Sequence, residues 1–216
     1  MNIIVPTLFD SKLSNGGFQR YAIPKKQAEE LFTFFRQHRL FNWKNANNGC
    51  EGRADAVCVL LDEWNIPNYK GWVFGGAYLK NHIGELKQNW KYHVAPVLSV
   101  VEDKNVIDYV LDPSSANSLL RIDDWAASIT LVPHSYYAIR RSEEYIFPSK
   151  DISNSKWNDR NRQNRKWMIQ CLAGINSLTA PGKAALSFQK VRLKNTAAAF
   201  EKLKKQKPNF KVFNKA

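Results

Sequence analysis

The sequence has few cysteines and no long apolar run. Its 216 residues include three cysteines, an odd number that is too small for a disulfide framework. We therefore expect a reducing compartment. No segment approaches the eighteen uninterrupted apolar residues of a membrane span, and residues 1–12 lack a basic region followed by an apolar stretch. We expect neither a membrane span nor a secretory signal.

What the sequence does contain indicates one globular domain. The composition is 44% hydrophobic and 12% aromatic, with seven tryptophans, which excludes a disordered chain. The positive charge is uneven, because residues 181–216 hold ten lysine and arginine residues against Glu201 alone, a net charge of +9 out of +13. We expect residues 1–180 to form the folded domain and residues 181–216 a basic helical segment. Such a segment can bind an acidic partner or an anionic surface, or can simply be a solvated helix face.

Hydrophobic periodicity predicts an alternation of helices and strands. The spacing predicts helices after Pro24, from Cys50 to about Asn65, at 121–127, at 157–178 and in the tail. Strands are predicted at Trp72–Leu79, Trp90–Val101 and Val106–Leu111, with shorter pieces at Ile129–Val132 and Tyr136–Ile139. The turn at 102–105 should join the second and third strands as an antiparallel hairpin.

The stretch Asn47–Trp64 is the most informative part of the chain. Turn-forming residues precede Cys50, and the apolar residues after it recur at helical spacing, so the cysteine should lie at a helix N-terminus. The unpaired N–H groups and positive dipole end of a first turn favour an anion, so we expect this thiol to ionise readily. The alternative is that Cys50 is a small buried residue at a helix end.

Three side chains offer the parts of a thiol hydrolase. Cys50 is the candidate nucleophile, His93 on a strand is the candidate general acid and base, and Asp112 follows the strand predicted to pair with it. Neighbouring strands lie about 4.8 Å apart, so His93 and Asp112 can meet if the register allows. The other candidates are weaker: His38, His82 and His134 lie in polar or proline-flanked surroundings, and Cys58 and Cys171 lie on apolar helical faces.

These residues occur in an order that resembles the protein-glutaminase family, bacterial enzymes that deamidate glutamine side chains within proteins. The matching pieces are Gly49-Cys50 with Arg53-Ala54, Trp90 with Tyr92-His93-Val94-Ala95, and Leu111-Asp112-Pro113-Ser114. The resemblance implies an α+β fold with a papain- and transglutaminase-like core, in which the nucleophile lies at a helix N-terminus packed on an antiparallel sheet. It also implies that Cys50, His93 and Asp112 form the triad. It covers about a third of the chain.

The implied reaction is hydrolysis of a protein-bound glutamine carboxamide through a Cys50 thioester, without cofactor or metal. Backbone N–H groups at the helix start would stabilise the oxyanion, with Asn48 or the Trp43 indole as candidate helpers. Candidate residues for the glutamine side chain are aromatic: Trp43, Trp72, Trp90 and Tyr92, for each of which core packing is the alternative. The same triad would also serve a transglutaminase or a cysteine peptidase, and a non-enzymatic basic binding module is the remaining alternative. The protein would act in the cytoplasm or be delivered to another cell by a secretion system as an effector.

Overall fold

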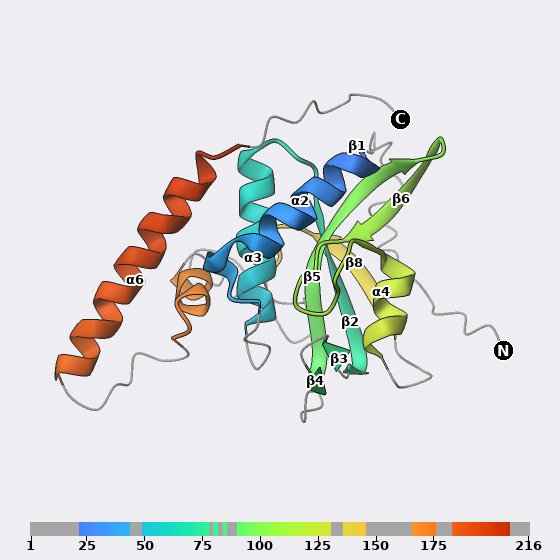
Figure 1. Cartoon of the computed structure of the whole chain (residues 1–216). Coiled ribbons are helices and arrows are strands. Elements are labelled where there is room, and N and C mark those ends of the chain that lie inside the picture. Colours follow the sequence, from blue (N-terminus) through green and yellow to red (C-terminus); the bar gives the residue numbers. More distant parts are fainter. Residues whose placement is uncertain are drawn as a thin grey trace, which may run out of the picture.

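The computed structural model describes residues 22–43, 49–77, 80–81, 84–85, 90–130, 136–145, 166–175 and 183–207. Within them, an antiparallel sheet lies between groups of helices (Figure 1). The labelled helices are α2 (Lys25–Gln37), η1 (Arg39–Phe41), α3 (Cys50–Glu63), α4 (Ile122–Ile129) and α6 (Lys183–Lys204), and residues 166–172 are helical as well. The predicted α+β fold is confirmed.

The main sheet is built around one long strand. β5 (Trp90–Glu102) pairs with β2 (Tyr69–Ala77) and β6 (Asn105–Val110), giving the order β7-β6-β5-β2-β8, with β7 at Leu120–Arg121 and β8 at Tyr136–Arg141. These pairs are antiparallel, and only the short β1 (Ile23–Pro24) joins β5 in parallel among the described strands. A separate small hairpin consists of β3 (Lys80–Asn81) and β4 (Gly84–Glu85).

Alternating residues of β5 face two different cores, as the period of a strand requires. Leu98 and Val100 belong to the core formed with α2 and α3. Ala95 and Val97 belong to a second core, formed with Trp125 and its neighbours on α4. The sheet therefore separates α2 and α3 from α4, and the two groups of helices lie on either side of it in Figure 1.

The two halves of α6 have different surroundings. Phe200 and Leu203 are buried in the core with α2 and α3, and the indole N–H of Trp64 donates to the carbonyl of Lys204 at 2.9 Å. Towards the other end of the helix, Phe188 and Val191 are 69% and 57% exposed. Figure 1 shows α6 as the outermost helix, on the side of α3 away from the sheet.

Most sequence-based boundaries agree with the structure to within a few residues. The β5–β6 hairpin, the α3 and tail helices and the strand at β8 are confirmed. The strand predicted from Ile129 is wrong at its first residue, because Ile129 is buried as the last residue of α4. Of the helix predicted at 157–178, residues 166–172 are helical and residues 173–175 are not. Residues 157–165 and 176–178 lie outside the described residues. None of the described helices is long and apolar enough to cross a membrane.

Candidate active site

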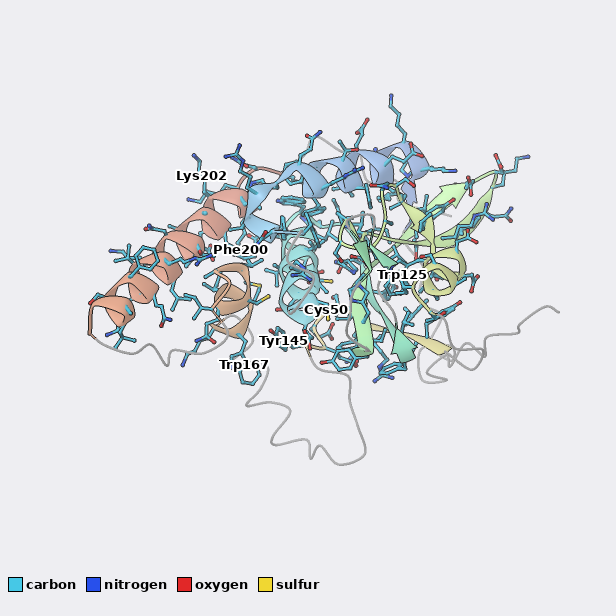
Figure 2. The ribbon with its side chains drawn as sticks, turned by 60° about the horizontal axis from the view of Figure 1, so that its bottom comes forward. Cys50, Trp125, Tyr145, Trp167, Phe200 and Lys202 are labelled. Atoms are coloured by element: carbon cyan, nitrogen blue, oxygen red, sulfur yellow. The ribbon has the colours of Figure 1, made fainter. Side chains whose placement is uncertain are left out.

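Cys50 is the first residue of α3, as predicted. Gly49 precedes it with φ of +90°, a left-handed conformation that glycine adopts without steric cost. The Gly49 carbonyl accepts the first helical hydrogen bond from the N–H of Arg53 at 3.0 Å. The side chain of Cys50 is buried, with Ala54, Trp72 and Val94 around it. Figure 2 shows Cys50 at the α3 N-terminus, with Tyr145 close by.

The expected ionisation of Cys50 is wrong for this state of the protein. Burial raises the pKa of the Cys50 thiol well above its usual value, and the charge of the adjacent Glu51 raises it further. The positive charge of Arg53 and a backbone hydrogen bond from Val94 act in the opposite direction with smaller effect. The helix N-terminus alone therefore does not decide the state of the thiol, because desolvation has the larger influence.

His93 and Asp112 are brought together by the β5–β6 pairing. Val97 pairs with Val110, and the Leu111 N–H donates to the Pro96 carbonyl at 2.9 Å, which extends the ladder beyond β6. Asp112 therefore comes opposite Ala95, diagonally adjacent to His93, a separation that longer side chains can span. The His93 Nε2 and Asp112 Oδ2 atoms are 2.8 Å apart, and both side chains are almost fully buried.

Asp112 accepts hydrogen bonds from several further groups. The Ser114 N–H donates to Oδ1 at 3.2 Å, and the Ser114 and Ser115 hydroxyls donate to the two carboxylate oxygens. The indole N–H of Trp125 donates to Oδ2 at 3.1 Å. Burial acts to raise the pKa of Asp112, but His93 and the serine hydroxyls together hold that pKa well below its usual value. The carboxylate is therefore fixed in its charged form.

Cys50 and His93 contribute to one small cavity. It has no room for a water molecule, and its lining also includes Trp43, Arg53 and Asp112. His93 additionally lies beside the Trp125 ring, with centroids 5.8 Å apart. The three predicted residues thus line one cavity from α3, β5 and the loop after β6, and the direct contact that the structure shows is that of His93 with Asp112.

The aromatic candidates differ in their surroundings. Trp43 lines the cavity and stacks with Arg53, whose Cζ is 6.0 Å from the ring centroid, but its indole N–H donates to the Phe35 carbonyl at 2.7 Å. The Trp43 indole is therefore not the oxyanion donor that we considered. Trp72 is fully buried against Cys50, and half-buried Tyr92 packs beside it, with ring centroids 5.5 Å apart. Asn48 lies outside the described residues, as does the side chain of Trp90.

The sequence analysis missed several neighbours of the site. Trp125 and Ser115 bind Asp112, and Glu51 contacts Cys50. Ser115 is three residues after Asp112 and fits a local side-chain turn, so its contact with Asp112 could have been predicted from the sequence. The contact of Trp125 with Asp112 could not, because the position of Trp125 depends on α4 packing against the sheet.

The remaining cysteines occupy different places. Cys58 is buried, and burial raises the pKa of its thiol strongly. Half-buried Cys171 lies against the first turn of α3, where its thiol donates to the Gly49 carbonyl at 3.2 Å. A Cβ at Gly49 or Gly52 would approach the Cys171 sulfur to 2.3 or 2.5 Å, so this contact requires glycine at both positions. Of the other histidines, His38 caps η1, and His82 and His134 lie outside the described residues.

The fold and the position of Cys50 agree with the predicted arrangement, an α+β protein with a cysteine at the start of a helix packed on an antiparallel sheet. Residues 28–129, just under half of the chain, match the family model Gln_deamidase_2, described as glutaminase. This match confirms the resemblance to the glutaminase family and the prediction of an enzyme of the glutaminase type.

Solved structures agree in fold. The chain is similar to protein-glutaminase with a TM-score of 0.55 and 18% identity, covering 76% of this chain and 96% of that one. It is similar to the A47Q2 mutant of pro-protein-glutaminase at the same score and identity, and to pro-protein-glutaminase at a TM-score of 0.52 and 16% identity. It spans 64% and 58% of those two longer chains, and 76% and 66% of its own length are covered. No curated protein matches the chain.

Proposed function

We propose that this protein hydrolyses the side-chain carboxamide of protein-bound glutamine to glutamate and ammonia, using Cys50, His93 and Asp112. The observation that carries the proposal is the buried 2.8 Å contact between His93 and Asp112 beside a cavity that Cys50 also lines. A cysteine nucleophile needs a base within reach and a third group that orients the base. The family match supplies the amide substrate class.

In the proposed reaction, the Cys50 thiol transfers its proton to His93 as sulfur attacks the carboxamide carbon. The oxyanion would accept hydrogen bonds from N–H groups of the first turn of α3, including that of Cys50, with Asn48 as the candidate side chain. Protonated His93 gives its proton to the departing ammonia, which leaves a thioester on Cys50. Neutral His93 then activates water, hydrolysis releases glutamate, and Asp112 keeps the imidazole in one tautomer.

The glutamine side chain would enter where aromatic residues surround Cys50. Trp43 and half-buried Tyr92 are the described candidates for contact with its methylene groups. Trp90 stays a candidate from the sequence. Trp72 is fully buried, so we assign it the support of Cys50 and Tyr92 instead of direct contact with substrate.

The reaction type is tested by one incubation with a glutamine-containing protein. Deamidation releases ammonia and adds about one dalton for each converted side chain, whereas a transglutaminase gives cross-links and a peptidase gives fragments. The expected result is ammonia with the one-dalton gain, lost in Cys50→Ala. Cross-links, which form with release of ammonia as well, or fragments, in either case without the one-dalton gain, would reject the deamidase in favour of the alternative that they indicate.

We also propose that the exposed part of α6 binds an acidic protein surface. Exposed Lys190, Arg192 and Lys194 lie beside exposed Phe188 and Val191, which gives a basic surface with an apolar centre. Deleting α6 would not test this, because Phe200 and Leu203 belong to the core. Replacing the three basic residues by glutamate should weaken salt-sensitive binding to an acidic protein substrate and leave turnover of a small glutamine peptide unchanged. Unchanged binding, or binding to anionic vesicles alone, would reject the protein partner.

We infer a reducing compartment, either the cytoplasm of the producing cell or that of a cell into which the protein is delivered. All three cysteines are free thiols, and a thioester mechanism needs a reduced nucleophile. Expression with a fluorescent tag, followed by localisation and by a thiol-oxidation measurement on Cys50, tests this inference. An extracellular, oxidised protein that is nevertheless active would contradict it.

A further inference from the structure

Glu51 occupies a position next to the nucleophile that the triad does not explain. It is the second residue of α3 and is half-buried. Its Oε2 accepts a hydrogen bond from the Cys50 thiol at 3.4 Å, and its Oε1 accepts one from the Tyr92 hydroxyl. The carboxylate therefore lies between the nucleophile and an aromatic wall of the site.

In the free protein the Cys50 thiol thus donates its hydrogen bond to a carboxylate. A negative charge beside a thiol disfavours the thiolate, and the pKa of Cys50 is raised by burial first and by Glu51 next. The pKa of Tyr92 is raised for the same two reasons. The titratable and charged groups around Cys50 in the described part of the chain are Glu51, Arg53, Tyr92, His93, Asp112, Tyr145 and Cys171. Among them, Glu51 accepts the hydrogen bond of the thiol.

The substrate carboxamide carries hydrogen-bond donors that the Glu51 carboxylate can accept. A primary amide carries two N–H donors on the nitrogen, whereas an ionised carboxylate carries none. When the amide carbon is about 3–3.5 Å from the sulfur, its nitrogen lies at a similar distance. The Glu51 oxygen is itself 3.4 Å from that sulfur, so an amide N–H that approaches on the same side of the sulfur comes within hydrogen-bond reach of Glu51. The product glutamate presents only acceptors and a like charge at this place.

We propose that Glu51 is a specificity-determining residue that holds the Cys50 thiol in the free enzyme and then accepts an amide hydrogen of the bound glutamine, favouring carboxamide over carboxylate. This inference rests on the proposed deamidase function. The amide hydrogen stays on nitrogen, so no proton is transferred to Glu51 in the reaction. Repulsion of the product carboxylate would speed release of the glutamate form.

The test compares Glu51→Gln with the wild type on one glutamine peptide and on its glutamate product. We expect KM to rise about tenfold, the size of one charge-assisted hydrogen bond, with a smaller change in kcat. Inhibition by the product peptide should become stronger, because the repelling charge is gone. The pH midpoint of Cys50 alkylation by iodoacetamide, followed by peptide mass spectrometry, should move to lower pH, because a negative charge beside the thiol is removed.

Glu63→Gln is the matched control, because it removes the same charge from the exposed C-terminal end of α3. It should leave all three measurements unchanged. Glu51→Asp keeps the charge but withdraws it by one methylene, so its values should fall between those of wild type and Glu51→Gln. A folded Glu51→Gln with unchanged KM and product inhibition overturns the inference, whatever the alkylation shows. If the wild type releases no ammonia, the deamidase proposal fails, and the shifted alkylation midpoint still reports the contact in the free enzyme.

Discussion

The two ends of the candidate triad are held in opposite electrostatic surroundings. Asp112 receives hydrogen bonds from His93, Ser114, Ser115 and Trp125, which keep its carboxylate charged although it is buried. Cys50 is also buried, and burial, reinforced by the carboxylate of Glu51 that its thiol faces, keeps the thiol protonated. Burial alone thus does not decide ionisation, because the partners of each group decide whether its charged form is stabilised.

The largest loss of activity is expected when one of the reacting side chains is removed. Cys50→Ala and His93→Ala should each reduce turnover of a glutamine peptide to near background, since one removes the nucleophile and the other the proton carrier. Ammonia release measures this. Cys58→Ala serves as the control, because Cys58 is buried away from the cavity and should lose stability but keep activity. Substantial turnover by folded Cys50→Ala would show that the nucleophile is another residue.

A smaller loss is expected when Asp112 is replaced. Asp112→Asn keeps the shape of the side chain but favours the wrong imidazole tautomer, an exchange that costs about 10⁴ in turnover in a serine protease. A cysteine nucleophile depends less on the third group, because a thiol gives up its proton more readily than a hydroxyl, so we expect a loss on the order of 10–10³. Asp108→Asn and Asp123→Asn, which remove carboxylates bonded to Ser99 and Tyr137, are the controls and should cost less activity. Full activity of folded Asp112→Ala would mean that another group orients His93.

The same aspartate predicts a dependence of stability on pH. The pKa of Asp112 is lower in the folded protein than its ordinary value of about 3.9, so its charged form stabilises the fold above that pH. This stabilisation is lost as the pH falls below that value and the carboxylate binds a proton. Thermal unfolding between about pH 2 and pH 5 should therefore show a weaker acid dependence in Asp112→Asn than in the wild type. Parallel curves for the two proteins would contradict the charged state of Asp112.

Trp125→Phe tests how much one of the hydrogen bonds to Asp112 contributes to stability and turnover. The change removes one donor to the carboxylate and keeps an aromatic ring beside His93, so we expect a loss of about 1.5–3 kcal/mol in unfolding free energy, together with reduced turnover. Trp64→Phe is matched, because that buried indole donates to the Lys204 carbonyl far along the chain. It should lose stability without a specific loss of turnover. Equal turnover in the two variants would show that Trp125 has no specific role in the site.

The smallest effect is expected on the Cys50 side at Cys171. Cys171→Ser keeps a donor for the Gly49 carbonyl and a side chain small enough for the space beside Gly52, so turnover should stay within about twofold of wild type. Peptide assays with and without reductant measure this. A loss as large as that of Cys50→Ala would make Cys171 a second essential thiol.

The sequence was informative where a function depends on a local pattern. The helix that begins at Cys50 follows from turn residues and helical spacing, and the approach of His93 to Asp112 follows from a hairpin with a short connecting turn. Both depend on neighbours in the chain. The donor from Trp125 could not be predicted, because it requires α4 to pack on a particular face of the sheet.

The state of the thiol was predicted wrongly for a related reason. A helix N-terminus is visible in the sequence, but the extent of burial is a property of the assembled site, where Ala54, Trp72 and Val94 surround Cys50. Glu51 was visible in the sequence as the next residue, yet its direction towards the sulfur depends on the bond from Tyr92. The division at residue 181 stays a prediction, because residues 176–182 lie outside the described ranges.

The attachment of α6 has a consequence for the order of events during synthesis. Trp64 and Lys204 are 140 residues apart, and Phe200 and Leu203 complete the core beside α2 and α3. The ribosome adds roughly 5–20 residues per second, so on the order of 5–20 s pass between translation of Asp112 and of Lys204. During that time the nascent chain already contains all three candidate catalytic residues but leaves the apolar surface around Trp64 uncovered. Completion of the core, and with it a mature enzyme, therefore waits for α6 to be translated.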